Sequence, residues 1–167
     1  GEVGAASVDI DAVGAVGAQD ITATSSYVDI DSTGAAGSIA AGAVSAQSDV
    51  LLTAVGDVTT ACITATTGLV DVDSTGGTIS AGAVSAAGNA SLTAAGDVNA
   101  GIDAGSVDVG AGGNANVGAT SASYIDIDAG NDANVTGASA GSSIDIDAGN
   151  GVNAGPLTAG SYVDVDA

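Results

Sequence analysis

The most regular feature of the chain is a four-residue alternation of apolar and acidic side chains, as in Ile144-Asp145-Ile146-Asp147. This tetrad, or a looser copy of it, starts at residues 8, 28, 50, 70, 90, 107, 125, 144 and 163, at intervals of 17 to 22 residues. Alternation with a period of two indicates a β-strand. A repeat of about 20 residues is typical of a solenoid with one structural unit per coil.

Two shorter alternating segments follow the tetrad in each repeat. In the first repeat they cover residues 16–18 and 21–23, with glycine or polar residues between them. Comparable segments recur at residues 39–44, 63–65 and 79–84. Glycine and small polar residues favour turns, and no stretch has the period of a helix. The sequence therefore predicts three short strands per coil and no helix.

Longer matches support a repeated origin for these coils. Residues 21–32 (ITATSSYVDIDS) match residues 63–74 (ITATTGLVDVDS) at an offset of 42 residues. The offset covers two repeats, so we infer that a two-coil unit was duplicated.

The first and third tetrad positions predict the core. One repeat has too little apolar material to fold alone, but parallel stacking would place equivalent residues in columns about 4.8 Å apart. The first inward column is Val8, Val28, Val50, Val70, Ala90, Val107, Ile125, Ile144 and Val163. The second is Ile10, Ile30, Leu52, Val72, Leu92, Val109, Ile127, Ile146 and Val165. Both columns are apolar in every repeat, which predicts a single parallel β-solenoid of about nine coils over residues 1–167.

Neither end of the chain has the sequence of a cap. Solenoids need polar or helical caps to hide their terminal coils. The sequence therefore predicts open ends, with two alternatives for what covers them. One is further repeats of a longer array, and the other is further copies of the same chain, stacked end to end into a filament.

Composition excludes several classes of function. The chain has no Lys, Arg or His and a net charge of −20, which disfavours nucleic acid and anionic membrane surfaces as partners. No apolar run is long enough to insert into a membrane.

With no His and one Cys, the sequence offers no disulfide framework, zinc site or nucleophile–base pair. Its carboxylates are repeated in identical sequence surroundings, whereas general acid/base catalysis needs two carboxyl groups whose environments give them different pKa values. We predict no enzymatic activity and no required cofactor.

The second and fourth tetrad positions are the candidate functional residues. They would form two outward columns in which carboxylates lie roughly 5 Å apart and repel one another by about 1 kcal/mol per pair in water. Three explanations stay open: weak Ca²⁺ bridging between coils, proton sharing, or simple screening by salt. The candidate Ca²⁺ ligands are Asp9, Asp11, Asp29, Asp31, Asp71, Asp73, Asp126, Asp128, Asp145, Asp147, Asp164 and Asp166.

Other side chains suggest surface roles. Four large residues directly precede a tetrad and would pack a corner or form an adhesive edge. These are Tyr27, Leu69, Tyr124 and Tyr162. Cys62 is interpreted as a partly exposed turn residue, with an intermolecular disulfide as the alternative. Threonine pairs at residues 22–24 and 64–66 do not continue in the repeats between them, which argues against an ice-binding threonine ladder.

Two segments add a family resemblance. Residues 51–58 (LLTAVGDV) and 91–98 (SLTAAGDV), together with the VDIDA-type tetrads, resemble the central repeats of filamentous haemagglutinin-type adhesins, which Gram-negative bacteria export by two-partner secretion. The resemblance implies a right-handed triangular β-helix and a secreted or cell-surface location. It also implies a stalk or adhesive role, with host or cell-surface ligands as partners.

Together these features predict a structural extracellular fibre, adhesin stalk or surface filament segment. Two alternatives remain. One is a filament subunit that assembles end to end, and the other is a Ca²⁺-binding surface module that uses the aspartate columns.

Overall fold

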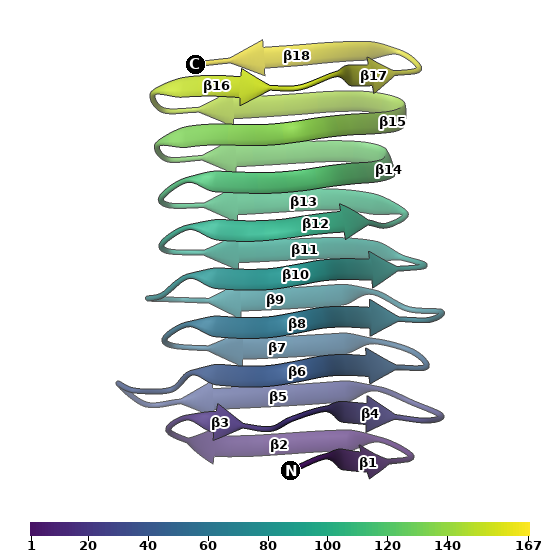
Figure 1. The fold of residues 1–167 in the computed structure, drawn as a ribbon, viewed down its shortest axis with the longest axis vertical. Coiled ribbons are helices and arrows are strands. Elements are labelled where there is room, and N and C mark those ends of the chain that lie inside the picture. The colour runs from purple at the N-terminus through teal and green to yellow at the C-terminus, as the bar shows by residue number, and fades with distance from the viewer.

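The computed structural model describes residues 1–167 as a stack of β-strands joined by tight turns (Figure 1). Seven strands that carry tetrads form the back layer: β2 (Val8–Val13), β5 (Val28–Thr33), β7 (Val50–Ala54), β9 (Val70–Ser74), β11 (Asn89–Ala94), β13 (Ser106–Ala111) and β18 (Tyr162–Asp166). The front layer contains β1 (Val3–Ala5), β3 (Val16–Gly17), β4 (Ile21–Ala23), β6 (Ile39–Ala46), β8 (Val58–Ala65), β10 (Ile79–Ala86), β12 (Val98–Asp103), β16 (Gly151–Ala154) and β17 (Leu157–Ala159). Two long strands, β14 (Ala115–Ala129) and β15 (Asp132–Ala148), turn from the front layer into the back layer.

Every strand pairs in parallel with its equivalent in the next coil. In Figure 1 the front strands run from left to right and the back strands from right to left as the chain climbs, so the coil is right-handed. This is the normal hand for parallel strands joined by a crossover. The structure therefore confirms the predicted parallel, right-handed β-solenoid. No helix in it is long and apolar enough to cross a membrane.

The two apolar columns form the core, as the sequence predicts. The register pairs Val107 with Ile125 and Ile125 with Ile144, and the second column follows in the same way. All buried apolar side chains belong to one continuous cluster of 41 residues. Ile127 and Ile146 are fully buried, whereas Val163 and Val165 in the last strand are each 42% exposed because no coil covers them.

The number of strands per coil differs from the prediction. The second and third segments are separate strands at β3 and β4 and again at β16 and β17, but they form single strands in β6, β8, β10 and β12. The junction between them keeps its register in the pairings of β8 with β6 and β10, but it is one residue shorter in β12, which appears as a register shift between Ser80 and Ala83 in the pairing of β10 with β12. Glycine is required there because a Cβ on Gly42 or Gly82 would collide with a carbonyl oxygen of the coil beneath. The front layer is therefore more continuous than the sequence suggests.

Candidate functional site: the aspartate face

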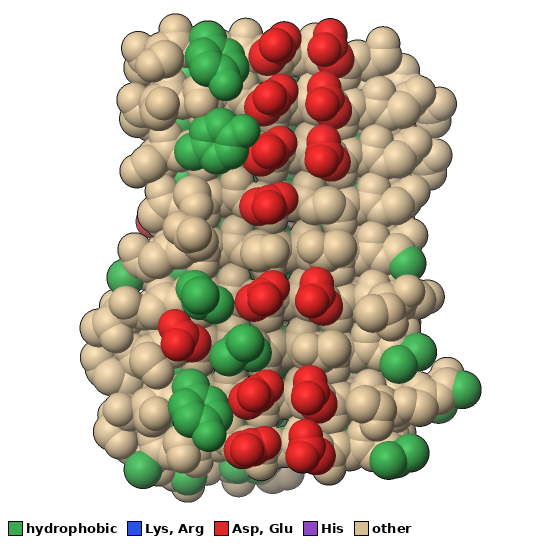
Figure 2. Space-filling model, turned by 180° about the vertical axis from the view of Figure 1, so that it is seen from behind, with side chains coloured by type: hydrophobic (Ala, Val, Ile, Leu, Met, Phe, Trp, Pro, Cys, Tyr) green, Lys and Arg blue, Asp and Glu red, His purple; other side chains and the backbone are tan.

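The aspartates of the tetrads cover the outward side of the back layer, which we call the Asp face (Figure 2). Because the first and third tetrad side chains point into the core, the second and fourth point to solvent. The first column in register is Asp9, Asp29, Leu51, Asp71, Ser91, Asp108, Asp126, Asp145 and Asp164. The second is Asp11, Asp31, Thr53, Asp73, Thr93, Gly110, Asp128, Asp147 and Asp166. The structure thus brings all twelve candidate aspartates onto one face.

The columns are interrupted, which divides the acidic surface into blocks. Leu51 and Thr53 of β7 separate the first two acidic coils from β9, and Ser91 and Thr93 of β11 separate β9 from the upper coils. Figure 2 shows these gaps as interruptions of the two red columns. The longest unbroken run lies in the first column from Asp108 to Asp164. Carboxylate density is therefore highest in the C-terminal half.

Several carboxyl groups on the Asp face resist ionisation. Partial burial against the sheet raises their pKa above the ordinary value of 3.8, and the negative charge of neighbouring carboxylates raises it further. The affected groups are Asp29, Asp71, Asp126, Asp128 and Asp145. Hydrogen bonds from Ser91 to Asp71 and from Tyr124 to Asp126 oppose the rise in part. The chain has no Lys, Arg or His to neutralise these charges.

A second set of aspartates, which the sequence analysis did not separate from the first, lies at bends and corners and has a structural role. The Oδ1 atom of Asp57 accepts hydrogen bonds from the backbone N–H of Thr78 (2.8 Å) and from its hydroxyl (3.1 Å), one coil above. Asp97 accepts one from the N–H of Asn114 (2.7 Å), and Asp49 one from the N–H of Leu69 (2.9 Å). These side chains supply acceptors where the backbone ladder is broken. The recurring Gly-Asp-Val turns at residues 56–58 and 96–98 were the available sequence signal.

The large residues before the tetrads flank the first aspartate column. Tyr27, Leu69 and Tyr162 are 37%, 39% and 54% exposed, so these residues do not fill a packed corner. The hydroxyl of Tyr124 donates to Oδ2 of Asp126 at 3.2 Å, and the carboxylate of Asp126 raises the pKa of Tyr124. Their use as an adhesive edge stays a prediction.

The calcium hypothesis stays a prediction as well. No group of three or more carboxylate or thiol side chains converges closely enough to hold a metal ion. Adjacent coils instead offer pairs of carboxylates about 4.8 Å apart on an open face. Such pairs fit weak, repeated binding of a hard cation rather than an enclosed site of six to eight oxygen ligands.

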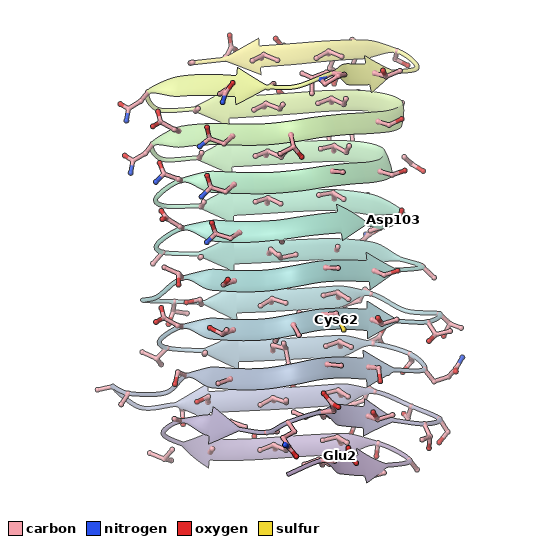
Figure 3. The ribbon with its side chains drawn as sticks, in the orientation of Figure 1. Glu2, Cys62 and Asp103 are labelled. Carbon is pink, nitrogen blue, oxygen red and sulfur yellow. The ribbon has the colours of Figure 1, made fainter.

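Cys62 lies away from the Asp face. It is half-buried in the front layer, in register with Ala43 of β6 and Ala83 of β10 (Figure 3). Its predicted partial exposure is confirmed, but its assignment to a turn is wrong because it lies within β8 and pairs in register on both sides. Its thiol forms no disulfide within the chain.

Comparison with known proteins adds no assignment, since no family model, curated protein or solved structure matches the chain significantly. The resemblance to haemagglutinin-type repeats therefore remains an expectation from sequence.

The two sets of aspartates should respond differently to the same substitution. We expect Asp57→Ala to lower the free energy of unfolding by about 1 kcal/mol, because it leaves donors of Thr78 without their acceptor. Asp145→Ala removes only a charge that its neighbours repel, so stability should stay level or rise. Urea denaturation followed by circular dichroism measures both. Equal losses would contradict the distinction.

Stability should increase on mild acidification. The raised pKa values mean that the folded chain holds protons more tightly than the unfolded chain, so protonation of these carboxyl groups stabilises the fold. This contribution is complete below the ordinary Asp pKa of 3.8 and is lost as the pH rises through the raised pKa values of the folded chain. At low salt we expect a higher Tm near about pH 4.5 than near about pH 7. Added salt should shrink the difference by screening. A matched variant, Asp126→Asn with Asp145→Asn, should flatten the profile, whereas a Tm that falls steadily from neutral pH would contradict the argument.

If Ca²⁺ bridges the columns, millimolar CaCl₂ should raise the Tm and EDTA should reverse the rise. The physical reason is that a shared cation removes repulsion that only the folded state experiences. NaCl at matched ionic strength is the control for screening. A Tm that responds equally to both salts would reject calcium bridging and leave screening as the explanation.

Proposed function

We propose that the chain is a shaft module of an extracellular fibre, of the kind found in the stalks of filamentous haemagglutinin-type adhesins. The observation that carries this proposal is the uniform stacking: one core cluster of 41 residues runs from Val8 in the first coil to Ile146 in the eighth, and the strands pair in parallel with their equivalents above and below. Such a fold is quasi-one-dimensional, so its length grows with the number of coils. At about 4.8 Å per coil, nine coils extend roughly 40 Å.

The chemistry of the surface also supports an exposed structural role. A chain with no Lys or Arg offers no cleavage site to trypsin-like proteases. A high net negative charge keeps the surface soluble and limits unspecific contact with anionic cell surfaces.

The tetrad of β18 shows how a further coil would fit onto the stack. Val163 and Val165 are each 42% exposed, whereas Ile144 and Ile146 in the coil beneath are fully buried. A further coil with the same tetrad would bury them and continue both aspartate columns. Further repeats of the same protein would supply that coil in a stalk.

Immunogold electron microscopy of the source cells tests this proposal. An antibody raised against the folded chain should label intact, unpermeabilised cells and should decorate the length of sheared fibres. A second antibody, against a cytoplasmic protein of the same cells, is the control for leakage. Labelling that requires permeabilisation would reject the extracellular shaft.

The alternative is a filament subunit that stacks end to end as separate copies. The isolated chain distinguishes the two: a subunit forms open-ended rods whose length rises with concentration, and a shaft module does not. Negative-stain electron microscopy of the purified chain gives the answer.

A further inference from the structure

The two faces of the solenoid differ sharply in charge. The Asp face carries both acidic columns, whereas the outward side of the front layer, which we call the front face, carries two charges between β6 and β17: Asp103 at the end of β12 (Figure 3) and Asp132 at the start of β15. One outward column there is Thr22, Ser45, Thr64, Ser85, Asp103, Ser121, Ser139 and Thr158. The other is Ala40, Thr59, Ser80, Asn99, Asn116, Asn134 and Asn153. Thr22 and Thr64, the first members of the two threonine pairs seen in the sequence, are thus joined through Ser45 in one column.

The middle of the front face is small and apolar. Between the two polar columns lies a third that includes Ala43, Cys62, Ala83 and Ala119. A shallow hollow of about 490 Å³ lies over Gly82, Gly101 and Gly118 at the centre. An apolar centre between polar margins is the usual anatomy of a protein–protein interface. Small side chains also allow a second sheet to approach closely.

Part of the polar surface of this face is already hydrogen-bonded. The side-chain amide of Asn116 donates to Oδ1 of Asn99 (2.8 Å), and that of Asn134 donates to Oδ1 of Asn116 (3.0 Å). Covering a polar group that keeps a partner costs much less than covering one without. The asparagine ladder therefore lowers the penalty for burying this side of the face.

The front face is large enough for a stable contact. Strands of eight residues such as β6 and β10, in about eight rows, span roughly 26 by 38 Å, or about 1,000 Å². A standard interface buries about 800 Å² on each partner. The Asp face has a comparable extent, but covering it would remove carboxylates from water with no cation in the chain to pair with them.

We propose that two copies of the chain associate laterally, front face against front face, with both Asp faces turned outward to solvent. The occupant is a second copy because the same weakly charged surface, of sufficient area, then serves both partners of a two-fold pair. Repulsion between two chains of charge −20 opposes the approach, so salt should promote pairing by screening. In a fibre this contact joins shafts side by side and is independent of stacking along the axis.

Sedimentation equilibrium on matched variants tests the proposal. Ser85→Asp and Ser91→Asp each add one negative charge at an outward position of a strand, the first on the front face and the second on the Asp face. We expect Ser85→Asp to weaken the dimer at least about tenfold, because a two-fold contact brings the new charge into the interface. Ser91→Asp should leave dimerisation close to that of the parent chain. Asp103→Asn, which removes the charge within the serine and threonine column of the front face, should strengthen it.

Each outcome bears on the proposal. Circular dichroism confirms that the variants are folded, and alkylation of Cys62 reports coverage of the front face, since its thiol should react more slowly as the dimer forms. A chain that stays monomeric at submillimolar concentration in high salt overturns lateral pairing. So does equal weakening by both serine variants, or association that leaves the alkylation of Cys62 unchanged. Open-ended rods with an unprotected Cys62 would instead indicate axial stacking.

Discussion

In-register parallel stacking is the constraint on which the rest of this structure depends. No coil contains enough apolar surface to fold alone, so Val, Ile and Ala become a core only when the equivalent residues of the neighbouring coils cover them. The full burial of Ile127 and the exposure of Val165 show both sides of this dependence. Stacking also acts on the surface, because each outward residue lies about 4.8 Å from its equivalents. A preference for one residue type in one phase of the repeat thereby becomes a stripe along the axis.

The aspartates show how this constraint gives one residue type two opposite effects. On the Asp face, stacking places like charges next to one another, and burial against the sheet together with these neighbouring charges raises the pKa of Asp128 and Asp145. At the corners, Asp57 and Asp97 bind the backbone of the next coil and hold the turns together. The core columns continue through β7 and β11, where the aspartate columns do not. The fold therefore does not depend on the acidic columns, and solvent, ions or protons must balance their charge.

Stacking also makes the two sides of the solenoid different from each other. One side is acidic along most of its length, and the other is built mostly from hydroxyl, amide and small apolar side chains, with Asp103 and Asp132 as its charges. A stalk that served only as a spacer would need a core and a soluble surface, with no difference between its sides. The concentration of charge on one face makes the weakly charged face the side on which a like-charged neighbour meets the least repulsion.

The sequence by itself determined the features that follow from phase within the tetrad. Alternation places Ile144 and Ile146 inward and Asp145 and Asp147 outward. The repeat then stacks them on their equivalents, whatever the conformation of the turns between them. The second half of the coil was decided by the tertiary structure. Repeats differ by up to five residues in length, since intervals run from 17 to 22, and only the folded chain shows where the register shift near Gly82 and the corners absorb the difference. For that reason the sequence could not predict that Thr22, Ser45 and Thr64 lie in one column, or that Asp57 contacts Thr78.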